Sequence, residues 1–160
     1  MESIKKLEST IEGWLKPLPH LPANIKKWIA NNIWWLDLVG VILIILTGIP
    51  LISAILLSLG ATAFFWSANI VALTGFAIFA TFSSLAFLAV SLVIMILAVK
   101  PLKALKKKGW DYLFIGLLVS CVSVIFTALS SFSSLFGGAI GVAISAYFLF
   151  EIRSYFVAVK

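Results

Sequence analysis

Three acidic residues lie at the edges of long uncharged stretches, where a carboxylate could bind a cation or carry a proton. They are Asp37, Asp111 and Glu151, and Arg153 lies two positions after the last of them. A carboxylate deep inside an apolar helix indicates a functional site by default, but these acids are near the ends of their stretches. We therefore expect Asp37, Asp111, Glu151 and Arg153 to form ion pairs between helices. A proton- or cation-handling site is the alternative.

Small and hydroxyl residues recur in the last third of the chain at spacings that place them on one helix face. The steps between them alternate between four and three residues in the first run and are four in the second, which matches helix-packing periods. The members of this small-residue stripe are Gly116, Ser120, Ser123, Thr127, Ser130, Ser134, Gly137, Gly141 and Ser145. Small residues let helix backbones approach closely, and such hydroxyls often bond to carbonyls of their own helix. We expect the stripe to be a packing seam; a polar conduit and a homo-oligomer face are the alternatives.

No residue pattern in the sequence is typical of catalysis or of metal binding. His20 lies among prolines without a second histidine, a cysteine or an acid at ligand spacing, so we interpret it as a linker residue. The lone Cys121 has no base or cation beside it in the sequence that would activate a thiol. We therefore expect no catalytic residues, no metal site and no cofactor, and we interpret the protein as non-enzymatic.

The elements that must position these residues are apolar. The chain is 62% hydrophobic and 11% charged, whereas soluble domains are about 25% charged. Residues 38–99 and 112–150 contain no Asp, Glu, Lys, Arg or His, and each stretch far exceeds the roughly 18 residues that suggest a membrane span. This composition excludes a soluble enzyme, a disordered chain and a disulfide-stapled secreted module.

Helix length alone allows three crossings in the first uncharged stretch and two in the second. Five crossings, however, would put two lysine clusters on opposite sides of the membrane, against the usual cytoplasmic bias of basic residues. We therefore predict an all-α integral membrane protein of four transmembrane helices in two hairpins. The predicted spans are about 33–58, 70–99, 110–130 and 135–155, within a domain of residues 32–160. Residues 59–69 form an outer interfacial segment in this prediction, and both termini lie in the cytoplasm at a plasma membrane of bacterial type.

Residues 1–31 predict an amphipathic interfacial region. Apolar residues such as Leu7, Ile11 and Trp14 share one helical face, and a proline-rich break follows them. A helix of this kind usually lies in the headgroup region of a membrane. A docking helix for a partner protein has the same pattern and is the alternative.

Tryptophans and lysines surround the predicted spans. Tryptophan is enriched at membrane interfaces, and lysine is attracted to anionic headgroups on the cytoplasmic face. The residues expected at the lipid interface are Trp14, Trp28, Trp34, Trp35, Trp66, Trp110, Lys26, Lys27, Lys106, Lys107 and Lys108. All but one of the basic residues are lysines, whereas recognition of nucleic-acid phosphates favours arginine. We therefore expect no nucleic-acid partner.

The function expected from these features is that of an accessory or scaffold subunit. Its partners would be membrane lipids and either another membrane protein or a second copy of the chain. The alternative is a transport or permeation protein, in one version a homo-oligomer, whose path follows the small-residue stripe.

Overall fold

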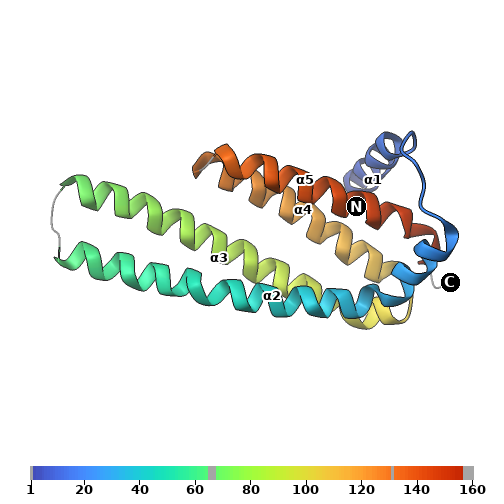
Figure 1. Ribbon diagram of the computed structural model, residues 1–160, viewed down its shortest axis with the longest axis horizontal. Helices are drawn as coiled ribbons and strands as arrows, with labels where there is room; N and C mark the ends of the chain where they lie inside the picture. Colours follow the sequence, from blue (N-terminus) through green and yellow to red (C-terminus); the bar gives the residue numbers. More distant parts are fainter. Residues whose placement is uncertain (1, 65–67, 131, 157–160) are drawn as a thin grey trace.

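The computed structural model describes residues 2–64, 68–130 and 132–156, with side chains at 6–60, 75, 78–127 and 135–156 (Figure 1). The protein is 91% helical, and no strand occurs in the described part of the chain. Four of the helices are long and apolar enough to cross a membrane. The prediction of an all-helical chain with four candidate spans is therefore confirmed at this level.

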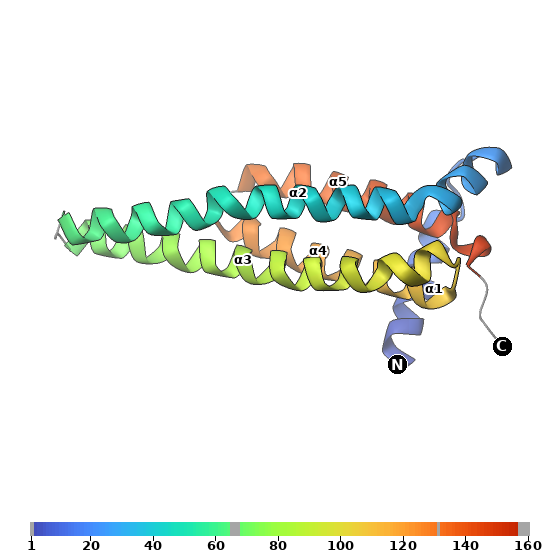
Figure 2. The ribbon, with the colours of Figure 1, turned by 90° about the horizontal axis from the view of Figure 1, so that it is seen from below.

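The helices follow one another along the chain with short connections. Their bounds are α1 Glu2–Leu15, α2 Ala23–Phe64, α3 Ala68–Lys103, α4 Lys107–Ser130, α5 Phe132–Glu151 and the 3₁₀ helix η1 Arg153–Tyr155. The long helices pack in chain order, α2 on α3, α3 on α4 and α4 on α5. Figure 1 shows that the α2–α3 hairpin extends well beyond the tip of the α4–α5 hairpin. Figure 2 shows α1 lying across the direction of the long helices, at the end opposite the hairpin tips.

Local sequence explains where the helices begin and end. Prolines at 17, 19 and 22 separate α1 from α2, because proline has no backbone donor and disfavours a helical conformation in the residue before it. Between α3 and α4 the chain turns tightly at Leu105, whose φ is 48°. Lys106 N donates to Pro101 O at 2.9 Å and closes this turn.

The bounds of two helices differ from those of the predicted segments. Residues 59–64 continue α2 and residues 68–69 begin α3, and residues 65–67 lie outside the described part; the outer interfacial position of residues 59–69 stays a prediction. The predicted boundary between residues 31 and 32 falls inside α2, which begins at Ala23. The helix that contains the predicted span of residues 70–99 is longer than that span, because α3 runs from Ala68 through Pro101 to Lys103.

The buried core lies at the end of the bundle that carries α1. Its largest fully buried side chains are Trp110, Phe114, Leu102 and Ile152. Trp110 stacks on Phe114 with ring centroids 5.3 Å apart, and its Nε1 donates to Leu149 O at 2.8 Å. The α3, α4 and α5 helices are therefore fixed together at this end.

Candidate functional site

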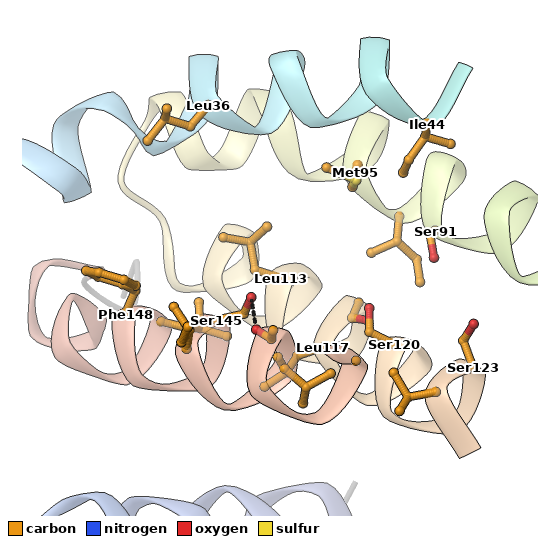
Figure 3. A pocket seen from close by; sticks show the side chains of 18 of the residues that line it. Leu36, Ile44, Ser91, Met95, Leu113, Leu117, Ser120, Ser123, Ser145 and Phe148 are labelled. Carbon is orange, nitrogen blue, oxygen red and sulfur yellow. Dashed lines mark hydrogen bonds between the residues drawn. The ribbon is translucent and has the colours of Figure 1, made fainter. Parts of the chain in front are cut away.

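An apolar groove of about 880 Å³ is bordered by all four long helices (Figure 3). We call it the inter-hairpin groove. Residues such as Leu36 on α2 and Phe148 on α5 face one another across it, and Met95 and Leu117 lie deeper on α3 and α4. Leu36, Ile144 and Phe148 remain 38%, 51% and 40% exposed. The groove therefore opens sideways, between α2 and α5.

The small-residue stripe contributes to the wall of this groove. Five of its members line the opening, namely Gly116, Ser120, Ser123, Gly141 and Ser145. Ser120 Oγ donates to Gly116 O at 3.0 Å, and Ser145 Oγ donates to Gly141 O at 2.8 Å. The hydroxyl of Thr127 likewise donates to Ser123 O at 2.9 Å. The side chains of Ser130 and Ser134 lie outside the described part.

Two glycines of the stripe, Gly137 and Gly141, do not make the close contact between α5 and α4 that their spacing predicts. A Cβ built at Gly137 or Gly141 meets nothing within 4 Å. At the adjacent Gly138, a Cβ would lie 2.7 Å from Cγ2 of Val124 on α4. The close approach of the two helices is therefore at Gly138, which sequence spacing did not single out. Gly138, Val124 and Gly141 all line the groove, so the contact between α4 and α5 forms part of its wall.

An ion-pair cluster ties the beginning of α2 to the end of α5. Glu151, whose side chain is 7% exposed, lies 2.6 Å from Nδ1 of His20 and 2.7 Å from Nζ of Lys26. It also accepts a hydrogen bond from Leu21 N at 3.0 Å. We call this cluster the Glu151 clamp. The hydroxyl of Tyr147 donates to Pro19 O beside it.

Arg153 forms a second link, which holds α1 against the bundle. Its guanidinium forms ion pairs with Glu8 and with Glu12, the latter at 2.6 Å. It also lies 5.5 Å from the ring centroid of Trp110. Glu151 and Arg153 thus pair with the N-terminal segment, and neither pairs with the α3–α4 connector or with the other.

The two remaining acids behave differently. Asp37 is 5% exposed, and neither carboxylate oxygen has a hydrogen-bond partner within the described residues. The ion pair expected at this position is therefore absent from the described part of the chain. Asp111 is partly buried on the first turns of α4, within electrostatic range of Lys107, Glu8 and Arg153.

The aromatic and basic residues expected at a lipid interface divide into several groups. Trp14, Trp28 and Trp35 are exposed, whereas Trp34 lies under Nζ of Lys103 at 5.1 Å. Trp110 was expected to face lipid but is 1% exposed, because its indole is part of the core. Trp66 lies outside the described residues. Among the lysines, Lys26 belongs to the Glu151 clamp, Lys27, Lys106 and Lys108 are exposed, and Lys107 is partly buried.

Sequence reasoning missed the role of His20, which it assigned to a plain linker. Its partner is 131 positions away in the chain, so no local spacing could reveal the pair.

Across the part of the chain that the structure describes, no group of three or more His, Cys, Asp or Glu residues could hold a metal ion. Comparison with protein-family models, curated proteins and solved structures finds no significant match.

Proposed function

We propose that this protein is a non-enzymatic integral membrane protein that acts as an accessory or scaffold subunit for a partner membrane protein. Its four long apolar helices cross the bilayer, and both ends of the chain lie on the cytoplasmic side. The one-sided placement of lysines supports this orientation, since Lys26, Lys27 and Lys106–Lys108 lie at the α1 end of the bundle. The crosswise α1, with Trp14 exposed, supports an interfacial position for that helix.

The observation that carries the proposal is the unequal length of the two hairpins. The uncharged parts of α4 and α5, residues 112–130 and 132–150, each span about 29 Å, which matches a hydrocarbon core of about 30 Å. The uncharged parts of α2 and α3, residues 38–64 and 68–99, span about 40 Å and 48 Å. The α2–α3 hairpin is therefore longer than the bilayer is thick.

An apolar hairpin of this length has two ways to avoid water. It can tilt, at a modest cost per ångström of mismatch, or it can be covered by another protein. Its distal part has no cover from α4 and α5, which end earlier (Figure 1). Leu56 and Leu57, near the end of α2, are 66% and 75% exposed. A partner subunit that packs on this distal part accounts for both the length and the exposure.

Site-specific photo-crosslinking in native membranes tests the proposal. A photoreactive amino acid at Leu57 should give a discrete protein adduct of higher mass. The same group at Ile125, which is 61% exposed on the shorter hairpin, serves as the matched control and should give lipid adducts alone. If Leu57 behaves like Ile125, the hairpin tilts in lipid and the accessory-subunit proposal is wrong.

A permeation protein is the second candidate, favoured by the hydroxyls that border the groove. Ser120 and Ser123 are part of its wall, and a polar path needs such groups. In a Cys121→Ser background, Ser123→Cys should then react with a membrane-impermeant thiol reagent in intact cells. Absence of labelling, with labelling of the same cysteine after detergent extraction, would eliminate this candidate.

A further inference from the structure

We propose that the inter-hairpin groove binds the hydrocarbon chains of a membrane phospholipid, which enter sideways from the bilayer between α2 and α5. This inference rests on the membrane insertion proposed above, and it does not depend on the existence of a partner subunit. Three features of the groove carry it: the direction in which it opens, the chemistry of its wall and its size.

The two rims of the groove are joined at one end, and the groove is open along its side. Lys26 precedes the groove residue Ile29 by one helical turn, and Glu151 follows the groove residue Leu149 by two positions. The 2.7 Å contact between Lys26 and Glu151 therefore joins the two rims at the α1 end. Farther along, Ile144 and Phe148 are exposed where they border the opening. A ligand thus reaches the groove from the side, where the lipid chains lie.

The wall of the groove is mostly apolar and provides few groups that could bind a polar ligand. Most of the lining side chains are aliphatic or aromatic, as the labelled Leu36, Met95 and Phe148 illustrate (Figure 3). Two of the bordering hydroxyls, those of Ser120 and Ser145, already donate to carbonyls of their own helices. No charged side chain is among the lining residues. A hydrocarbon chain is complementary to such a wall, because the chain requires no hydrogen bonds and gains dispersion contacts with the apolar side chains.

The volume of the groove distinguishes between apolar occupants. A transmembrane helix, about 10 Å wide and about 30 Å long, occupies roughly 2,400 Å³. The groove measures about 880 Å³, so it would enclose only part of a helix from a second copy or a partner, most of which would lie outside the opening. At roughly 30 Å³ per methylene, close to the volume of a water molecule, the groove holds about thirty such groups. That is the size of the two acyl chains of one phospholipid.

Glycines of α5 provide a matched pair of variants. Gly141 borders the groove and Gly137 does not, yet a Cβ at either position meets nothing within 4 Å. Gly141→Trp therefore adds an indole at a position that lines the groove, and Gly137→Trp adds the same indole one helical turn away, at a position that does not line it. Ser145→Phe, one turn farther along the same wall, is a second filling variant.

The experiment compares phospholipid retention. Full-length protein is reconstituted in vesicles of phosphatidylethanolamine and phosphatidylglycerol, extracted in mild detergent and weighed by native mass spectrometry. The wild type and Gly137→Trp should retain one phospholipid, and Gly141→Trp and Ser145→Phe should retain about five- to tenfold less. Equal retention by all four proteins, or none by the wild type, would overturn the inference.

A second copy of the chain would occupy the groove instead if the wild type is a dimer and Gly141→Trp converts it to a monomer without changing the amount of retained lipid. That outcome would also overturn the inference. The Leu57 crosslink should persist in Gly141→Trp, which separates this inference from the partner proposal.

Discussion

The imidazole Nδ1 of His20 lies 2.6 Å from Oε1 of Glu151, although 131 positions separate the two residues in the chain. This contact, together with Lys26, brings the proline-rich segment before α2 to the end of α5. The same residues join the two rims of the groove at one end. The Glu151 clamp therefore connects the N-terminal segment to α5.

The first prediction concerns the charge of Glu151. Glu151→Gln keeps the size of the side chain but removes the charge that Lys26 faces, so a buried partner of an ion pair is lost. Hydrogen bonds to charged groups contribute about 1.5–3 kcal/mol to stability, and the exposure of His20 to solvent reduces this contribution. We therefore expect the free energy of unfolding to fall by about 1–2 kcal/mol. Thermal unfolding in mild detergent measures the change. Lys27→Gln, at the exposed neighbour of Lys26, is the control and should be nearly neutral.

The second prediction concerns the close approach of α4 and α5. Gly138→Ala places a methyl group 2.7 Å from Cγ2 of Val124, whose branched side chain has little freedom to move away. We expect a loss of about 1–3 kcal/mol in stability. Gly137→Ala meets nothing within 4 Å and should instead gain up to about 1 kcal/mol from helix propensity. Unfolding midpoints that shift equally for the two variants would show that the helices do not meet at Gly138.

These glycines also show what the sequence could and could not predict. Four spans followed from the uncharged stretches and from the lysines that bound them, because the cost of burying charge in lipid limits where helices can cross. The faces of those helices could not be assigned, since α2 and α3 are apolar on all sides and carry no amphipathic stripe. A small-residue spacing of four suggested Gly137 and Gly141 as the seam, whereas the contact lies at Gly138, one residue away. Rotation of a helix about its axis is decided by side-chain packing, which spacing alone does not specify.

The third prediction concerns the indole of Trp110. Trp110→Phe keeps an aromatic ring against Phe114 but removes the donor that Leu149 O accepts at 2.8 Å. The buried carbonyl of Leu149 then has one hydrogen-bond partner fewer, and the smaller ring leaves a cavity. We therefore expect the free energy of unfolding to fall by about 1–3 kcal/mol. Trp28→Phe provides the control, because Trp28 is 56% exposed and should be within about 0.5 kcal/mol of the wild type. If both variants unfold like the wild type, Trp110 is not part of the core.

The last prediction is that a substitution at Asp37 increases the stability of the protein. Asp37 is 5% exposed and its two carboxylate oxygens have no hydrogen-bond partner in the described part of the chain. An unpaired buried carboxylate is destabilising, because the charged group has left water without gaining a compensating contact. Asp37→Asn has nearly the same shape and removes the charge, so it should raise the stability by about 1–2 kcal/mol, detectable as a higher unfolding midpoint in detergent. The control is Asp111→Asn: partial burial and Glu8 disfavour this charged carboxylate, whereas Lys107 and Arg153 favour it, so the change in stability should be smaller than at position 37. A lower midpoint for Asp37→Asn would mean that the carboxylate is held by a cation or donor, and Asp37 would then be part of a binding site.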